Sequence, residues 1–151
     1  MTEMTVVIRE VSAPDRPEWE RLYQGYAEFY KVTQTAEMRQ TVWGWINDAG
    51  HETQCRVAIT PQGHLLGLAH FRPFARPLSA TTGGFLDDLY VEPEARGTGV
   101  VDALIEAVRA EGRKEGWSVI RWITAEDNAR ARAVYDRMAT QTQWVTYDLK
   151  V

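Results

Sequence analysis

The stretch FLDDLYVEPEARGTGV, residues 85–100, decides how this chain folds. Residues 85–91 favour a β-strand, and a loop with Gly97 and Gly99 separates them from an apolar helical pattern that begins at Val100. Two glycines so placed let the backbone approach a ligand closely, and the first turn of a helix offers unpaired N–H groups and a partial positive charge. The order strand, glycine loop, helix therefore predicts either an anion site suited to a pyrophosphate or an ordinary tight turn.

Two common phosphate-binding loops do not fit this stretch. A Walker loop needs a Gly-Lys-Ser/Thr sequence, which the stretch lacks. The third glycine of a dinucleotide-binding GxGxxG would fall on Asp102, and an acid there would face the phosphate. Any phosphate site at this loop must therefore follow another pattern.

The rest of the chain alternates between strand-like and helix-like patterns. We expect helices over residues 16–30, 35–46, 100–112 and 128–138, and strands over 6–11, 55–60, 65–71, 85–91, 117–124 and 142–149. Residues 73–84 have the composition of a loop, and 117–124, apolar on both faces, is expected to be a central strand. This order predicts an α/β fold in which helices flank a mixed sheet.

Length and composition fit one domain spanning residues 1–151 of an ordinary globular protein, with 44% apolar and 25% charged residues. The net charge of −4 argues against a nucleic-acid partner and suits a cationic amine, although mild acidity also simply aids solubility. No apolar run approaches the ~18 residues of a membrane span. One cysteine, Cys55, and three scattered histidines form no metal-ligand pattern, so we expect no metal, no intrachain disulfide and a cytoplasmic location.

The stretch closely resembles the acetyl-CoA signature of the GNAT N-acetyltransferase superfamily. That signature is a strand, then V-x-P-x-x-R-G-x-G-x-G/A, then a helix; here Val91 to Gly99 carries it. A second motif, N-x-x-A/S-x-x-x-Y, follows about thirty residues later in the family, and Asn128 to Tyr135 matches it. The resemblance implies a GNAT fold: a mixed, mostly antiparallel central sheet flanked by helices, with a V-shaped splay between two central strands that binds CoA. The strand residues 86–91 look most like those of the spermidine/spermine acetyltransferase branch.

The chain departs from the signature at its last position, where Val101 replaces glycine or alanine. One interpretation is that Val101 joins a core stripe with Leu104, Ile105 and Val108. The other is that its branched side chain weakens cofactor binding, up to a protein that binds CoA without catalysis.

The resemblance assigns cofactor contacts to the two motifs. Backbone groups of Leu89, Tyr90 and Val91 would hold the thioester carbonyl and the pantetheine arm. The pyrophosphate would lie on the loop and helix start, formed by Arg96, Gly97, Thr98, Gly99, Val100 and Val101. Asn128 would contact the pantetheine arm, and it is equally suited to cap the helix that follows.

Three kinds of side chain are candidates for the chemistry. Tyr135 matches the family tyrosine that protonates the departing thiolate, though it also fits a core position on its helix. Asp87 stands where the polyamine branch has its proposed base, with a water relay expected because aspartate is short. Asp87 and Asp88 are neighbours in a strand, so we expect their side chains to point to opposite faces of the sheet. Asp88 is a second candidate for substrate binding. The alternative for both acids is a surface ion pair.

Aromatic residues of the two N-terminal helices complete the predicted acceptor site. Tyr26, Tyr30 and Trp45 would line it, since aromatic walls suit cationic amines, although ordinary core packing also explains each of them. We expect His70 to be structural, and Trp117, Trp122 and Trp144 to lie in the core.

Together these features predict an acetyl-CoA-dependent N-acetyltransferase acting by direct attack of a primary amine, such as a polyamine or an amino acid. The alternatives are a non-catalytic CoA-binding module and an acetyltransferase for protein N-termini or lysines. The family resemblance also implies a homodimer.

Overall fold

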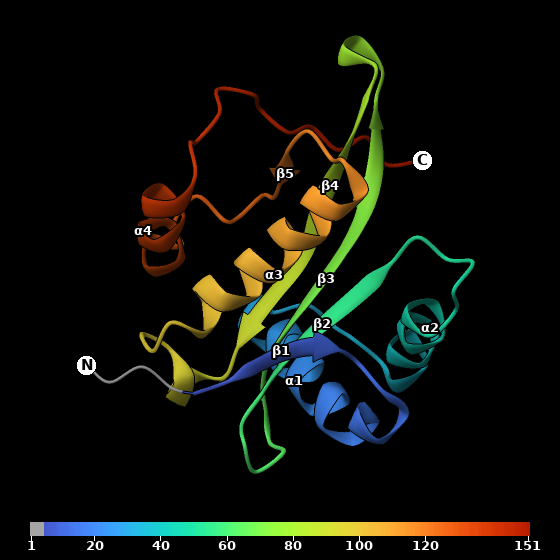
Figure 1. The fold of residues 1–151 in the computed structure, drawn as a ribbon, viewed down its shortest axis with the longest axis vertical. Coiled ribbons are helices and arrows are strands. Elements are labelled where there is room, and N and C mark those ends of the chain that lie inside the picture. The colour runs from blue at the N-terminus through green and yellow to red at the C-terminus, as the bar shows by residue number, and fades with distance from the viewer. Residues whose placement is uncertain (1–4) are drawn as a thin grey trace.

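The computed structural model describes residues 5–151 and has one five-stranded sheet with helices on both faces (Figure 1). Its strands are β1 (Val7–Glu10), β2 (Gln54–Ile59), β3 (Leu65–Arg76), β4 (Thr81–Val91) and β5 (Ile120–Arg121). Its helices are α1 (Arg16–Phe29), α2 (Ala36–Ile46), α3 (Val100–Glu115) and α4 (Ala129–Met138), with short 3-10 turns at Ala13–Asp15, Pro77–Ser79 and Pro93–Ala95. The strands lie in the order β1-β2-β3-β4-β5, antiparallel except for the parallel pair β4–β5. This is the α/β arrangement expected from the sequence.

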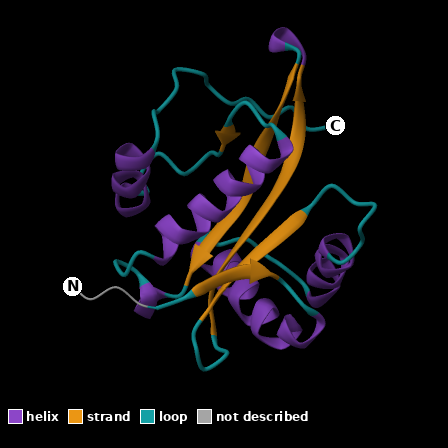
Figure 2. Ribbon diagram, viewed as in Figure 1, coloured by secondary structure: helices purple, strands orange, loops and turns teal. Residues whose placement is uncertain are grey.

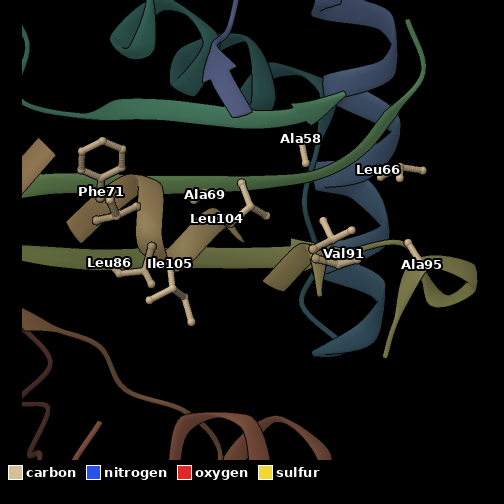
Figure 3. Packing of buried hydrophobic residues seen from close by; sticks show 11 residues of the cluster. Ala58, Leu66, Ala69, Phe71, Leu86, Val91, Ala95, Leu104 and Ile105 are labelled. Carbon is tan, nitrogen blue, oxygen red and sulfur yellow. The ribbon is translucent and has the colours of Figure 1, made fainter. Parts of the chain in front are cut away.

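Two apolar clusters fix the helices to the sheet. On one face, called here the α3 face, Leu104, Ile105 and Val108 of α3 pack against Phe71 of β3 and Leu86 of β4 (Figure 3). On the other, the α1 face, Trp19, Leu22 and Tyr23 of α1 pack against Leu65 and Leu68 of β3, with part of α2 alongside. All these side chains are buried, and their burial is the main favourable term for holding the layers together.

The β3–β4 hairpin is longer than the sequence indicated. The expected loop over residues 73–84 is wrong, because β3 continues to Arg76 and β4 begins at Thr81, with Pro73 opposite Gly84 and Arg76 opposite Thr81. The prolines and glycines of this stretch had suggested a loop. Pro73 lies beyond Phe71, the last β3 residue paired with β2, so β3 has only β4 as a partner there. Gly83 gives room for the Phe74 ring, since a Cβ there would lie 2.8 Å from it.

The last two strands differ more from expectation. The expected central strand 117–124 is wrong: only Ile120–Arg121 is regular, and it lies at the end of the sheet order. The expected strand 142–149 is also wrong, since residues 139–151 are loop (Figure 2). Trp117 and Trp122 pack against the core as expected, but Trp144 is 85% exposed and is not a core residue.

Within residues 5–151, no helix is long and apolar enough to cross a bilayer. The same residues bring together no group of three or more His, Cys, Asp or Glu side chains that could hold a metal ion.

Candidate functional site

The cleft of this protein arises because β4 pairs with β5 over only two residues of each strand. β5 pairs with β4 at Gly84 and Phe85, and the Gly84 amide donates to the Val119 carbonyl (2.9 Å). The Trp117 ring lies directly on Gly84, where a Cβ would approach it to 2.4 Å. Beyond this point the β5 side of β4 has no strand partner among the described residues, which leaves the backbone groups of residues 86–91 open along that edge.

A cleft occupies this opening and collects residues from five parts of the chain. Its walls come from the end of α1, the end of β4, the glycine loop, the start of α3, and α4. The lining residues are Phe29, Tyr30, Leu89, Tyr90, Val91, Arg96, Gly97, Val101, Asn128, Arg130, Ala131, Val134 and Tyr135. Seven of the predicted cofactor contacts are among them, as are Tyr135, predicted to bind the cofactor and protonate its thiolate, and Tyr30 from the predicted acceptor group.

The glycine loop adopts a backbone conformation that favours glycine. Gly97 and Gly99 have φ values of 77° and 89°, a region that side-chain-bearing residues avoid. The amides of Gly97, Thr98 and Gly99 have no hydrogen-bond acceptor among the described residues, and Gly99 is the N-cap of α3. Unpaired amides beside the positive end of a sixteen-residue helix fit a pyrophosphate group. The Thr98 hydroxyl donates to the Ala95 carbonyl and thereby braces the loop.

The two valines at the start of α3 differ in their surroundings. Val100 is fully buried on the stripe with Leu104, Ile105 and Val108, whereas Val101 is half-buried, packing against this cluster and lining the cleft. Val101 therefore packs against the core and also reaches the cleft wall, and its effect on cofactor binding stays a prediction.

Arg96 and Asp102 are held by partners. The Arg96 guanidinium lies over the rings of Phe29 (5.2 Å) and Tyr90 (5.9 Å), and all three residues line the cleft. Asp102 points away from the loop and pairs with Arg137 of α4 at 2.8 Å, so its charge is neutralised close to the anion site.

Tyr135 projects from α4 into the cleft with its ring against Trp122, 5.3 Å between centroids. Burial, with a smaller contribution from Tyr30, raises the pKa of Tyr135 to about 12. The phenol is therefore protonated at neutral pH and can donate a proton, and the ring packing fixes its direction.

Asn128 serves as a helix cap and also faces the cleft. Its Oδ1 accepts from the Ala131 amide (3.4 Å), and its Nδ2 donates to the Tyr30 hydroxyl (3.4 Å). The second bond joins α4 to the end of α1 across the cleft.

A β-bulge in β4 sets the direction of the two adjacent acids. The register shifts between His70 and Phe71, which face Asp88 and Leu86, so Asp87 is the extra residue. Asp88 contacts His70 and Asp87 contacts Arg72. His70 and Arg72 are two apart in β3 and share a face, so both acids lie on the α1 face. The expectation that they point to opposite faces is wrong, because the bulge interrupts the alternation.

Asp88 is the centre of a buried hydrogen-bond network. It accepts from the Tyr23 hydroxyl (2.8 Å) and from His70 Nδ1 (2.9 Å). Burial alone would raise its pKa, but the hydrogen bonds from His70, Tyr23 and Tyr26 outweigh this and lower the pKa below its usual value. Asp88 therefore remains ionised at neutral pH.

His70 is structural, as its position in the hairpin suggested, and it orients Asp88. Its burial disfavours a charged ring, although the neighbouring Asp88 carboxylate favours one. The Trp19 indole N–H, however, donates to Nε2 at 3.0 Å, and an indole can only donate. We therefore assign the neutral tautomer, with its proton on Nδ1 and directed at Asp88.

Asp87 has a different environment. Its carboxylate is about one-third exposed and accepts from Arg72 Nε at 3.1 Å. Burial raises the pKa of Asp87, and the Arg72 charge opposes this only in part. Of the two acids, Asp87 is therefore the better proton acceptor and Asp88 the more firmly ionised.

The predicted aromatic residues separate into two groups. Tyr26 lies between Tyr30 (5.0 Å) and Tyr90 (6.0 Å), so a line of rings connects the Asp88 network to the cleft. Trp45 is not part of this line; it is 42% exposed and stacks on His51. Phe29, Arg130 and Arg72 also belong to the site, although they were not predicted from the sequence. Only Phe29 could have been found there, because it directly precedes Tyr30.

The comparisons with known proteins agree with this geometry. The Acetyltransferase (GNAT) family matches residues 19–139. The chain is a GNAT acetyltransferase. As a member of this enzyme family it uses acetyl-CoA, and the unpaired loop amides and the open edge of β4 are the groups that fit the cofactor.

This GNAT acetyltransferase has relatives with several acceptors. It is 27% identical to the D-amino-acid N-acetyltransferase HPA3 of Saccharomyces cerevisiae, over 97% of this chain and 92% of that protein. The aminoglycoside N-acetyltransferase AAC(6')-Iy in complex with CoA shares its fold with a TM-score of 0.84 at 19% identity, covering 97% of this chain and 95% of that one. The ribosomal-protein-alanine N-acetyltransferase from Brucella melitensis biovar Abortus 2308 does so with a TM-score of 0.78 at 21% identity, covering 97% of this chain and 100% of that one.

Proposed function

We propose that this GNAT acetyltransferase transfers acetyl from acetyl-CoA to the primary amine of a small amino acid. The observation that carries the proposal is the set of opposite charges that the bulge gathers on the α1 face of β4. The ionised Asp88 suits an ammonium group, and the Arg72 guanidinium suits a carboxylate. Arg72 uses only Nε for Asp87, and neither of its Nη groups has a partner among the described residues. The 27% identity to a D-amino-acid acetyltransferase supports this choice.

A polyamine is the second candidate acceptor. Two neighbouring acids on one face, together with the resemblance of residues 86–91 to the polyamine branch, favour it. Arg72 argues against it, because a polyamine has no carboxylate to pair with this cation. Protein N-termini and lysines remain a third class to be tested by peptides.

In the proposed reaction, Asp87 takes the proton of the substrate ammonium, directly or through a water. Its raised pKa and partial exposure suit this role better than the buried, firmly ionised Asp88, which anchors the amine. Bound acetyl-CoA supplies the activated acetyl thioester. Tyr135 holds the proton that the departing sulfur needs, and Asn128, Tyr30 and the Leu89–Val91 edge orient the groups in the cleft.

The loop from Arg96 to Val101 is the proposed pyrophosphate site. The amides of residues 97–99 and the first turn of α3 supply the donors, and the Arg96 guanidinium, over Phe29 and Tyr90, supplies a positive charge beside them. Val101 forms an apolar wall of the cleft beside this site.

Thiol release from acetyl-CoA across D- and L-amino acids, their amides, polyamines and short peptides tests the acceptor. We expect amino acids with a free carboxylate to have higher kcat/KM than their amides. Arg72→Gln should raise KM for the free acid about tenfold more than KM for the amide, worth about 1.4 kcal/mol, whereas any change in kcat caused by the loss of the Arg72–Asp87 pair should be the same for both acceptors. Arg109→Gln, an exposed arginine on α3 paired only with Glu106, is the matched control. Faster acetylation of polyamines than of every amino acid would refute the proposal.

We also propose that residues 1–151 form one acetyltransferase domain that acts in the cytoplasm as a homodimer. The lone, buried Cys55 suits a reducing compartment.

A further inference from the structure

The turn end of the β3–β4 hairpin has a sheet face that the helices of the α1 face do not cover. Figure 1 shows this end extending well away from α1 and α2. Two half-buried aromatic residues lie there, Phe74 of β3 and Phe85 of β4, and neither belongs to the apolar cluster that α1 and α2 form with the sheet. Two arginines flank them, Arg72 of β3 and Arg121 of β5. These four residues are called here the hairpin cluster.

The strand register places the hairpin cluster on one face of the sheet. Phe85 lies opposite Arg72 on one side and opposite Arg121 on the other, so these three residues form a row across three strands. Side chains alternate along a strand, and Ile120 packs into the α3 face, so Arg121 points to the α1 face. Phe74 lies two residues after Arg72 and shares its face. The cluster therefore continues the surface that carries the two acids of β4.

Each guanidinium in the hairpin cluster lies over a ring. The Arg72 Cζ is 5.0 Å from the Phe85 centroid. The Arg121 Cζ is 5.4 Å from the Phe74 centroid, and the two rings meet edge to face at 5.9 Å. A guanidinium over a ring keeps N–H groups free along its edge. The cluster therefore offers a ligand hydrogen-bond donors and positive charge rather than a bare aromatic surface.

Arg121 is the arginine of this cluster whose charge has no acceptor. It is half-buried, and within residues 5–151 its side chain has no hydrogen-bond or ion-pair partner. By contrast, Arg72 Nε donates to Asp87 at 3.1 Å. Arg76, further along β3, donates from Nη1 to the Ser118 hydroxyl at 2.8 Å. Partial burial removes some of the water around a guanidinium, and an anionic group that accepts its hydrogen bonds compensates for that loss.

We propose that Arg121 binds the side-chain carboxylate of the acceptor, and that the acceptor is an acidic amino acid. This inference rests on the function proposed above, in which Asp88 anchors the ammonium group and Arg72 pairs with the α-carboxylate. Arg121 then supplies a second cation for the second carboxylate of the same molecule. A neutral side chain leaves this guanidinium without an acceptor, and a basic side chain is repelled by it.

The positions of the two arginines suit a small dicarboxylate. Their strands lie on either side of β4, which places their backbones about 10 Å apart at ~4.8 Å per strand. Arg72 reaches over Phe85 of β4, and Arg121 reaches to the Phe74 ring, which meets Phe85. The two guanidinium groups thus face the space above β4 from its two sides. A small molecule lying there can contact both, with its amine toward the acids of the same strand.

Glutamate and glutamine are the deciding pair of acceptors, because they differ in side-chain charge and hardly in shape. Steady-state thiol release from acetyl-CoA, with the D and L forms of each, should give a kcat/KM for glutamate about tenfold above that for glutamine. Arg121→Gln should abolish this preference by raising KM for glutamate far more than KM for glutamine. Arg113→Gln removes an exposed arginine of α3 that likewise has no side-chain partner among the described residues, and it should keep the preference.

The outcomes separate this inference from the proposed function. If the wild type prefers free amino acids to their amides but acetylates glutamate no better than glutamine, the inference is overturned and the proposed function stands. Faster acetylation of phenylalanine than of glutamate also overturns it, since that would indicate an aromatic subsite. An equal loss for glutamate and glutamine in Arg121→Gln would show that Arg121 only supports the sheet. Acetylation of no amino acid at all would remove both. The wild-type comparison needs no variant, so it decides the question even if Arg121→Gln fails to fold.

Discussion

Replacing Tyr135 with phenylalanine tests the chemistry most directly, because the structure separates its hydroxyl from its packing. The ring lies against Trp122 and lines the cleft with Val134, contacts that phenylalanine keeps. No hydrogen bond of the Tyr135 hydroxyl to another described residue is broken by the change. The substitution therefore removes a proton donor with little effect on folding or on the shape of the cleft.

The expected magnitude follows from that separation. Loss of a positioned general acid costs roughly 10- to 1,000-fold in kcat, which is about 1.4 to 4.1 kcal/mol of barrier. The KM for acetyl-CoA and the melting temperature should change little. Because burial raises the pKa of Tyr135 to about 12, the wild type should show no loss of kcat from tyrosine ionisation up to about pH 10.

The assay is steady-state thiol release at saturating acetyl-CoA, paired with calorimetric titration of CoA on both proteins. Equal kcat in wild type and Tyr135→Phe would refute the role of Tyr135 as proton donor. A fall in kcat accompanied by an equal loss of CoA affinity would instead show that the hydroxyl only binds.

Two further predictions concern stability and binding. Val101→Gly should destabilise the fold by roughly 1–2 kcal/mol, since it removes a half-buried side chain and places glycine at a helix start, and CoA affinity should stay level or fall; a tenfold gain by titration would show that Val101 obstructs the cofactor. Asp88 has a lowered folded-state pKa, so its contribution to stability is present above its ordinary pKa of 3.8 and is lost as the pH falls below that value. Asp88→Asn should therefore lower the melting temperature at pH 7 and make it fall less between pH 5 and pH 3; parallel acid titration curves for the two proteins would contradict the assignment.

Local sequence determined the parts of this protein whose conformation depends on near neighbours. The helical spacing of apolar residues located α1, α2, α3 and α4 to within a few residues. Gly97 and Gly99 predicted a loop whose backbone can approach a ligand closely, and both adopt the positive φ that few other residues tolerate. The same motif led to the acetyl-CoA site, since a glycine loop before a helix start supplies its donors within one short stretch.

Pairing between distant strands decided the rest. Whether Asp87 and Asp88 share a face depends on the register of β4 against β3, and the bulge that shifts it is set by partners fifteen or more residues away in sequence. The hairpin around Pro73 and Gly84, and the placement of Arg72 beside Asp87, follow from the same pairing. Residues 142–149 show the reverse case: their alternation predicts a strand, yet a strand exists only when another edge accepts its hydrogen bonds, and no described strand of the same subunit does so.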